Sequence, residues 1–397
     1  MPPADEANLV AVRARGRDAL EAIVRAWDRG DAVAPLDPRA PAAAIEARLA
    51  LLRPTHVDDG DGPRRVGDGH RRGEPVPAGV AAVLPTSGTT GTPRAVQLDH
   101  DALAASARAV HAAIGCEPGD AWLCCVPVHH VAGLAIVNRA RVHGLGLVVH
   151  DAFDVAAVGA SPQDDGTTLV SVVATMLTRL LDSGAPVEQF RVVLLGGGPV
   201  GRELVARARE RGAHVATTYG MTETGGGCVH DGHALPGVDV RIGADGEIQV
   251  RGPVVMRGYH RDADATRDAF TRDGWLRTGD VGELTPDGAL HVVDRRRDLV
   301  ITGGVNVSPT AVESVLVRHP AVADVCVTGV PDREWGERVV AHVVPADPRA
   351  APTLDSLRAF ARDALTPAEL PREVRVTSSI PRTSSGKPQR GRLRART

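Results

Sequence analysis

The sequence TSGTTGTPR, residues 86–94, follows the apolar run GVAAVLP and is the most informative part of the chain. Its glycines permit tight or left-handed backbone, and its hydroxyls and backbone N–H groups can surround an anion such as a phosphate. A flexible Ser/Gly-rich surface linker has a similar composition. The rest of the chain has to decide between a phosphate-binding loop and a linker.

Strand-like and helix-like patterns alternate after this loop, which predicts a mainly parallel sheet with helices on its faces. The strand-like runs are at 79–85, 120–128, 190–195 and 213–220, the helical patterns are at 100–115 and 201–212, and residues 168–184 look like a short strand that runs into a helix. Before the loop, residues 7–28 and 41–52 have helical spacing, whereas the polar, Gly-rich residues 58–77 predict an exposed loop.

Two changes of pattern predict the domain organisation. Residues 237–252 and 285–293 look like β-turn regions with an Asp-Gly at each tip, and a helix–strand–strand–helix pattern follows the junction DRRRD, residues 294–298. The fold class expected is α/β: an N-terminal domain over 1–296, of mainly parallel sheets with flanking helices and a β-rich subdomain, and a small α+β C-terminal domain over 297–397.

Composition excludes several classes of protein. The 397 residues carry a formal net charge of -3 with a pI of about 6.6, which favours neither nucleic acid nor an anionic membrane as a partner. The five Cys lack zinc-site spacing, which is typical of a reducing cytoplasm. We find no signal peptide pattern and no apolar run long enough to span a membrane, so a cytoplasmic protein is expected.

GGGPVG, residues 196–201, matches a dinucleotide-binding fingerprint between a strand and a helix. That fingerprint also needs an acidic residue at the end of the next strand to bind the ribose, and AHVATTYG has none. An NAD-dependent enzyme is therefore disfavoured.

Three further clusters carry polar groups suited to a nucleotide. In TTYGMTETGGG, residues 217–227, Tyr219 can stack on a base, Thr222 can bond a phosphate, and Glu223 can hold Mg²⁺. GWLRTGD ends at Asp280, and PRTSSGKPQR contains Lys387. Taken singly, a buried Tyr, a helix cap, a turn Asp and a solvated Lys explain them equally well.

Together these clusters resemble the adenylate-forming superfamily, which includes acyl-CoA synthetases, adenylation domains of peptide synthetases and luciferases. The resemblance spans about residue 30 to the end and rests on six motifs in the family's order. They are TSGTTGTPR, GGGP, TTYGMTET, GWLRTGD, DRRRDLVITGGVNVSP and PRTSSGKPQR. The resemblance implies that TSGTTGTPR holds the β- and γ-phosphates of ATP.

The resemblance also assigns roles to single residues. Lys387 would bridge the substrate carboxylate and the α-phosphate, Thr222 would contact the α-phosphate, and Glu223 would bind Mg²⁺. Asp280 would bind the ribose hydroxyls, with Arg295 nearby. The residues expected around the phosphates, the adenine and the acyl group are Thr86, Ser87, Gly88, Thr89, Thr90, Gly91, Gly196, Gly197, Gly198, Tyr219 and Gly220.

The implied reaction joins a carboxylic acid to AMP with release of pyrophosphate, after which a thiol displaces AMP. Lys387 and Mg²⁺ would stabilise the charge at the α-phosphorus. In this family the small C-terminal domain rotates between the two steps and brings residues 301–305 to the thiol channel. ATP, Mg²⁺ and coenzyme A are the ligands implied, and a homodimer is a candidate assembly.

Several positions depart from the family's pattern. Arg94 and Ala95 stand where Lys and Gly are common, and Arg has a different geometry from Lys. Asp294 replaces a Gly, Arg297 occupies the hinge position, and Val305 replaces a frequent Glu. None of these changes removes a residue that the chemistry requires.

The N-terminal part is short, and with CVPVHHVAGL and VLLGGGPV it is similar to o-succinylbenzoate–CoA ligases of menaquinone synthesis. His129 and His130 are candidates for the acyl pocket, whereas HDGH, residues 230–233, lacks the ligands of a metal site. Two alternatives stay open. One is a freestanding adenylation enzyme, or a ligase for another acid, that loads a carrier protein in trans. The other is a non-catalytic nucleotide-binding protein.

Overall fold

The computed structural model describes residues 5–66, 73–86, 94–382, 386 and 388–394. The chain divides into two compact units, one of residues 1–240 and 250–277 and one of residues 241–249 and 278–397. The predicted domain boundary between residues 296 and 297 stays a prediction.

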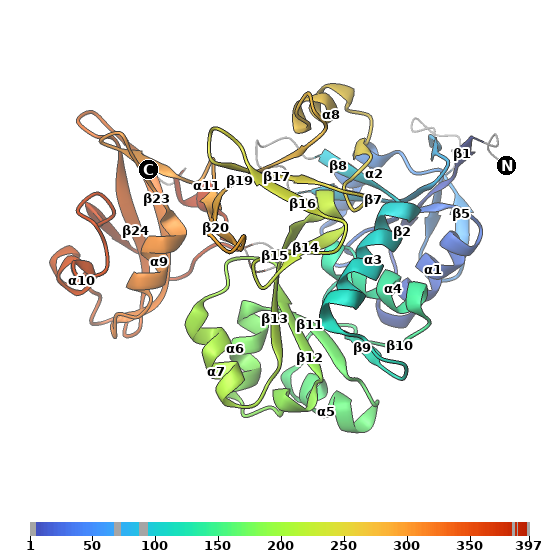
Figure 1. Cartoon of the computed structure of the whole chain (residues 1–397), viewed down its shortest axis with the longest axis horizontal. Helices are drawn as coiled ribbons and strands as arrows, with labels where there is room; N and C mark the ends of the chain where they lie inside the picture. Colours follow the sequence, from blue (N-terminus) through green and yellow to red (C-terminus); the bar gives the residue numbers. More distant parts are fainter. Residues whose placement is uncertain (1–4, 67–72, 87–93, 383–385, 387, 395–397) are drawn as a thin grey trace. The chain divides into compact units, whose positions relative to one another are not determined.

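The first unit contains the predicted mainly parallel sheet, in the order β10-β9-β11-β12-β13-β14-β15 (Figure 1). Strands β10, β9, β11, β12 and β13 are parallel, and the last two are antiparallel. Their bounds are β9 (Ala121–Cys124), β10 (Gly146–Val149), β11 (Leu169–Val173), β12 (Val192–Gly196), β13 (Val215–Met221), β14 (Gly226–His230) and β15 (His233–Ala234). β12 is buried along its whole length, as a continuous apolar run predicts.

A second sheet of the same unit has the order β18-β8-β7-β3-β2-β4-β5. Its strands are β2 (Leu9–Val12), β3 (Ala32–Pro35), β4 (His56–Asp58), β5 (Pro63–Arg65), β7 (Val80–Thr86), β8 (Arg94–Asp99) and β18 (Gly258–Tyr259). β2, β3, β4 and β7 pair in parallel, and β5, β8 and β18 are antiparallel additions. A short ribbon pairs β1 (Glu6–Ala7) with β6 (Val76–Pro77).

Two predictions for this region are wrong in part. The helix predicted over 7–28 begins only at Gly16, because LVAV at 9–12 is a strand buried on both faces, and a short apolar run does not distinguish strand from helix. The loop predicted over 58–77 contains strand β5, whose polar residues pair with β4 at the edge of the sheet.

The helices of the first unit cover both sheets. They are α1 (Gly16–Asp28), α2 (Ala42–Leu52), α3 (His100–Ile114), α4 (Val131–His143), α5 (Val155–Asp164), α6 (Ala174–Asp182), α7 (Arg202–Glu210) and α8 (Ala263–Ala269), with 3₁₀ turns η1 (Val187–Gln189) and η2 (Thr222–Thr224). Figure 1 shows α5, α6 and α7 beside the parallel strands β11 to β13. α3 and α4 pack together, and Asn138 of α4 donates to the Leu103 carbonyl of α3 (2.8 Å).

The second unit is rich in β-structure, as predicted. The four-stranded sheet β16-β17-β19-β20 contains β16 (Asp239–Ile242), β17 (Glu247–Arg251), β19 (Leu276–Leu284) and β20 (Leu290–Arg295). The five-stranded sheet contains β21 (Val300–Thr302), β22 (Val305–Val307), β23 (Val322–Asp332), β24 (Gly336–Pro345) and β25 (Glu373–Val376). Helices α9 (Pro309–Leu316) and α10 (Leu354–Ala361) pack on it around a core of mostly Val and Leu, and α11 (Arg390–Arg394) contacts β23.

Across the described ranges, no helix combines the length and the apolar character needed to cross a membrane.

Candidate active site

The predicted phosphate and metal residues lie where β13 ends. The strand passes into the turn η2, which places Thr222 and Glu223 at the carboxyl edge of the parallel strands. The buried Thr224 hydroxyl fixes this turn, because it accepts from the Met221 N–H (3.0 Å) and donates to the Gly226 carbonyl (2.7 Å). Carboxyl ends of parallel strands are the usual ligand site of open α/β sheets.

Tyr259 orients the carboxylate of Glu223. Its hydroxyl donates to Glu223 Oε1 over 3.0 Å, and burial together with this carboxylate raises the pKa of Tyr259. The Arg94 guanidinium lies 5.2 Å from the centre of the Tyr259 ring, and its Nε is 3.7 Å from Asp262 Oδ2. Arg94, one of the departures from the family's pattern, therefore stacks on the residue that holds Glu223, an interaction for which a planar guanidinium is well suited.

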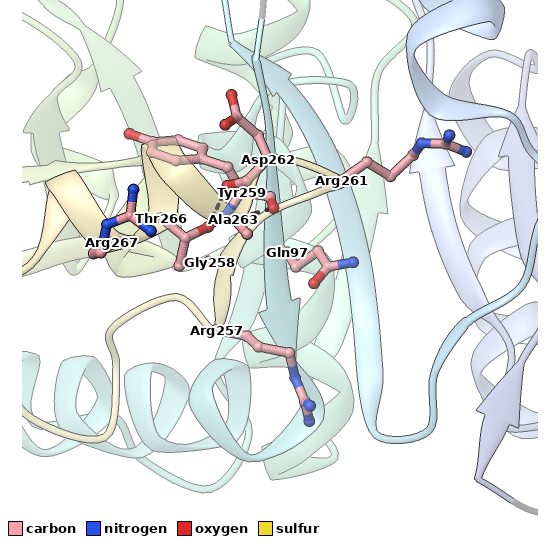
Figure 2. Close-up of a pocket in the computed structure, with 9 residues that line it drawn as sticks. All are labelled: Gln97, Arg257, Gly258, Tyr259, Arg261, Asp262, Ala263, Thr266 and Arg267. Carbon is pink, nitrogen blue, oxygen red and sulfur yellow. Dashed lines mark hydrogen bonds between the residues drawn. The ribbon is translucent and has the colours of Figure 1, made fainter.

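The pocket drawn in Figure 2 adjoins this tyrosine but does not contain the predicted nucleotide-binding residues. It encloses about 640 Å³ between β8, β18 and α8. Its arginines each have a carboxylate partner: Arg257 with Asp99, Arg261 with Glu74, and Arg267 with Asp264. Figure 2 shows Arg257 and Arg261 pointing away from the Tyr259 ring. Because its cations are neutralised, this pocket is a poor anion site.

The structure shows for each described glycine of the predicted site whether packing, backbone conformation or neither requires a residue without a side chain. A Cβ on Gly196 would lie 2.5 Å from Thr218 Cγ2, and one on Gly220 would lie 1.9 Å from the Gly226 carbonyl oxygen, so close packing alone requires both. Gly197 has a φ of +83°, which favours glycine. Gly198 is exposed, and nothing lies within 4 Å of its Cβ position. Gly198 is therefore the glycine of this group with room for a ligand beside it, and the half-buried Tyr219 lies on the adjacent strand β13.

In the second unit, Asp280 of β19 lies directly opposite Arg295 of β20, as the expected pairing requires. The Arg295 Nε is 3.4 Å from Asp280 Oδ1, and Asp280 is buried. The Thr278 hydroxyl accepts from the Asp280 N–H (3.1 Å) and donates to the Ile248 carbonyl (2.7 Å). The structure thus brings Asp280 and Arg295 together, while their role in binding ribose stays a prediction.

The structure explains why an aspartate can stand at position 294, where the family's pattern has Gly. Its Oδ2 accepts from the Ser308 hydroxyl (2.8 Å) and the Thr310 N–H (2.9 Å), and it thereby helps to cap the N-terminus of α9. Arg297 is partly buried beside Asp298, and burial lowers its pKa. Val305 is exposed on the hairpin of β21 and β22.

His129 and His130 precede α4, and their ring centres are 4.5 Å apart. Burial, and to a smaller extent His130, lower the pKa of His129 to about 4, although the Asp37 carboxylate 3.9 Å away acts in the opposite direction. His129 is therefore a neutral, buried ring at pH 7. The structure places both residues near each other, and their role in an acyl pocket stays a prediction.

Part of the expected site lies outside the described residues. Ser87, Gly88, Thr89, Thr90, Gly91 and Lys387 belong to this part. Thr86 is described: it ends β7 opposite Arg94 of β8, and its hydroxyl is 3.3 Å from the Arg94 carbonyl oxygen. In the sequence, the predicted phosphate loop lies between β7 and β8, two strands that pair antiparallel.

Sequence reasoning missed a buried polar cluster next to this site, consisting of Arg139, His230 and Thr218. Arg139 of α4 is 4% exposed, its Nε has no hydrogen-bond partner, and no described carboxylate forms an ion pair with it. Neither ring nitrogen of His230, 7% exposed, has a partner, nor does the hydroxyl of Thr218, which lies opposite His230 on β13. Burial lowers the pKa of Arg139 to about 10, and burial and Arg139 lower that of His230 to about 4.

The backbone of Gly226 and Gly227 runs along the polar cluster. A Cβ on Gly227 would lie 2.1 Å from Thr218 Oγ1 and 3.2 Å from His230 Nε2, and one on Gly226 would lie 3.7 Å from Arg139 Nη2. Buried donors without partners are costly and rare in folded proteins. The polar cluster is therefore suited to an anionic ligand group. Its only sequence signal is Arg139 shortly after the apolar run VAGLAIV, residues 131–137.

Comparison with known proteins agrees with this geometry. The family model for the AMP-binding enzyme matches residues 52–260, and the model for the AMP-binding enzyme C-terminal domain matches residues 311–387. A probable 2-succinylbenzoate–CoA ligase of Mycobacterium tuberculosis is 39% identical over 333 residues, covering 81% of this chain and 86% of the relative. The 2-succinylbenzoate–CoA ligase of Listeria monocytogenes is 36% identical, covering 80% and 70%.

Solved structures give the same result. The o-succinylbenzoate CoA synthetase of Bacillus subtilis in complex with its acyl-adenylate intermediate has a TM-score of 0.88 at 29% identity, covering 98% of this chain and 88% of that one. The same enzyme in complex with ATP and magnesium ion has a TM-score of 0.87 at 29% identity, covering 98% and 90%. The chain belongs to the AMP-binding enzyme family of adenylate-forming enzymes.

Proposed function

We propose that this protein is an ATP-dependent acid–thiol ligase that converts o-succinylbenzoate to its acyl-adenylate and then to the CoA thioester. A relative that is 39% identical to it over the aligned residues is named as a probable 2-succinylbenzoate–CoA ligase. The Bacillus subtilis enzyme binds the corresponding acyl-adenylate. The reaction belongs to menaquinone synthesis.

The observation that carries the choice of substrate is the buried guanidinium of Arg139, whose Nε has no hydrogen-bond partner and which contacts the Trp122 ring but forms no ion pair with a described carboxylate. o-Succinylbenzoate has two carboxylates, of which only one is activated, so the other needs a partner when it is buried. Thr218 of the polar cluster also contacts the Cβ position of Gly196, a predicted pocket residue. A carboxylate at the polar cluster would neutralise Arg139 and accept from the Thr218 hydroxyl.

The proposed chemistry needs no protein nucleophile. The carboxylate oxygen attacks the α-phosphorus of ATP, the bond to the bridging oxygen breaks, and pyrophosphate leaves. The CoA sulfur then attacks the acyl carbon, and AMP leaves with the former carboxylate oxygen. Lys387 and Thr222 stabilise charge at the α-phosphate, while Asp280 and Arg295 bind the ribose and the loop at residues 86–91 holds the outer phosphates.

Glu223 fits the proposed magnesium site. Its carboxylate supplies the oxygen ligand that Mg²⁺ prefers, and one carboxylate with substrate phosphates is a common arrangement for this ion. Among the described residues no group of three or more His, Cys, Asp or Glu side chains is arranged to hold a metal, which agrees with a site completed by ATP. When bound, the ion would neutralise phosphate charge, and Tyr259 would keep Glu223 in place.

The experiment that tests the function is pyrophosphate release with ATP, Mg²⁺ and a panel of carboxylic acids, with and without CoA, followed by mass detection of the products. We expect o-succinylbenzoyl-CoA as the product. An acyl-adenylate that passes to a carrier protein but not to CoA would support carrier loading instead. Binding of ATP without turnover of any acid would contradict the ligase proposal.

The location and domain motion also belong to the proposal. None of the five cysteines forms a disulfide, which fits the reducing cytoplasm. The domain of residues 297–397 is proposed to rotate between the two half-reactions with Arg297 at its hinge, and the homodimer stays a candidate assembly.

A further inference from the structure

The segment around Lys387 is unusual in composition and in its contacts. Lys387 is the only lysine among the 46 Lys and Arg residues of the chain. The residues on either side of it, 380–382 and 388–393, make specific contacts with one strand, β23, and with helix α9. These contacts are not explained by the proposed roles of any residue in catalysis.

On the C-terminal side, Arg390 forms a buried ion pair. Its Nη2 donates to Glu313 Oε2 of α9 over 2.9 Å, and the two side chains are only 10% and 16% exposed. Its Nη1 is 3.6 Å from Cys326 Sγ of β23. The other oxygen of Glu313 accepts from the Val327 N–H (2.6 Å) of the same strand. Glu313 therefore joins the helix, the strand and the arginine that follows Lys387 by three residues.

On the N-terminal side, Arg382 forms an ion pair with Asp324 of β23 through two hydrogen bonds. Its Nη2 donates to both carboxylate oxygens (2.8 and 2.9 Å), and its Nη1 donates to the Gly386 carbonyl (3.0 Å). Arg382 also forms a β-bridge with Pro388, and the Gln389 N–H donates to the Pro381 carbonyl over 2.8 Å. These contacts join residues 381 and 382 to residues 386, 388 and 389, so the described residues that flank Lys387 in the sequence contact one another.

Two of the residues that contact the arginines lie on the same face of β23. Asp324 and Cys326 are two residues apart on a strand, so their side chains point to the same side. Ile380 and Leu393, on either side of Lys387 in the sequence, pack against Cys326 in a small apolar cluster. Arg382, Ile380 and Leu393 thus contact β23, whereas Arg390 contacts β23 at Cys326 and α9 at Glu313.

We propose that the ion pairs Arg390–Glu313 and Arg382–Asp324 are positioning contacts that set the place of Lys387 for the adenylation half-reaction. The inference rests on the proposed function, in which Lys387 acts on the α-phosphate. A flexible lysine side chain on an unanchored loop reaches a given point rarely, and small displacements of a catalytic group reduce rates strongly. The four residues act through Lys387 and do not themselves contact substrate.

Two variants test the two anchors, the ion pairs Arg390–Glu313 and Arg382–Asp324, and one matched variant serves as control. Arg382→Met and the double variant Glu313→Gln/Arg390→Met each remove one anchor, and the double change leaves no unpaired charge in the buried site. Arg338→Met is the control, because the Arg338–Glu373 pair (2.8 Å) lies on the same sheet, away from both anchors, with side chains 29% and 31% exposed. The Arg382–Asp324 pair is similarly exposed, at 33% and 35%.

The experiment measures the rates of the two half-reactions separately and compares them. We expect each anchor variant to slow adenylation, measured as single-turnover pyrophosphate release, by about tenfold or more. Thioester formation from supplied acyl-adenylate and CoA should change by less than about twofold, because it does not use Lys387. The control should leave both half-reactions unchanged. Equal losses in both half-reactions would indicate a general effect on the small domain, and unchanged adenylation would also overturn the proposal.

A second measurement does not depend on catalysis. Because the chain has a single lysine, an amine-reactive reagent modifies only Lys387 and the N-terminal amine, and peptide mass spectrometry separates the two. We expect the anchor variants to change the rate of Lys387 modification relative to the N-terminal amine, and the control to leave it unchanged. If the native enzyme forms no adenylate with any acid, the proposed function fails, while this labelling experiment still decides whether the ion pairs fix Lys387.

Discussion

Replacing Arg139 with Met is expected to stabilise the protein and to impair its activity. The guanidinium is 4% exposed and has no carboxylate partner among the described residues. Burial lowers its pKa well below the usual value of an arginine, to about 10. At about 1.4 kcal/mol per pH unit, holding the charge there without a partner costs roughly 3 kcal/mol. Met fills similar volume without charge, so most of this cost should disappear from the free protein.

The free-energy cost of the buried charge also limits how much Arg139 can contribute to binding the substrate. A ligand carboxylate that pairs with Arg139 would recover at most about 3 kcal/mol, which corresponds to roughly 100-fold in affinity. The Arg139→Met variant should therefore lose up to about 100-fold in kcat/KM for o-succinylbenzoate. An acid that lacks the second carboxylate should be used equally well by both proteins.

The assay combines thermal unfolding with steady-state kinetics on the two acids. Arg141→Met is the matched control, since Arg141 lies two residues further along α4 and pairs at the surface with Asp28 (2.7 Å), and it should change neither quantity much. A lower melting temperature for Arg139→Met, together with unchanged kinetics, would refute both the unpaired state of Arg139 and its role in substrate binding.

The remaining predictions concern single residues. Lys387→Ala should abolish adenylation and leave the circular dichroism spectrum unchanged; substantial adenylate formation would remove Lys387 from the mechanism. Asp280→Ala should weaken ATP binding in calorimetry, and an unchanged affinity would contradict its role at the ribose. The pKa of His230 is lowered to about 4 in the folded protein, so its contribution to stability is complete above about pH 6.5 and is lost as the pH falls towards 4. Up to about 3 kcal/mol is involved, and His230→Gln should flatten this acid limb in denaturant titrations; an unaltered limb would contradict the assignment. Tyr259→Phe removes the hydrogen bond to Glu223 and should raise the Mg²⁺ concentration needed for half-maximal rate, without changing the melting temperature by more than a few degrees; an unchanged requirement would count against this role.

Much of the fold could be predicted because the patterns were long or repeated. The helices α3 and α9, the buried strand β12 and the turns with Asp-Gly at their tips all follow from local spacing and turn chemistry. The strands β2 and β5 could not be predicted. LVAV is too short to show a period, and the pairing of β5 with β4 depends on a neighbour seven residues away at the edge of a sheet.

The residues of the site also fall into those that could be predicted from the sequence and those that could not. Motif order was enough to pick out Glu223, Asp280 and Arg295, and the structure gives each of them a close partner. Arg139 could not be assigned, because α4 is buried along most of its length and its sequence does not reveal which side faces β14. His230 was considered only as part of an unlikely metal site, since its proximity to Arg139 arises from strand pairing and helix packing.

The contacts made by β23 have a further consequence for Lys387. A strand repeats its side-chain direction every two residues, or about 7 Å, so β23 sets the spacing between Asp324, which binds Arg382, and Cys326, which contacts Arg390. Accuracy at the end of a flexible side chain would in this way come from the most regular element of the small domain.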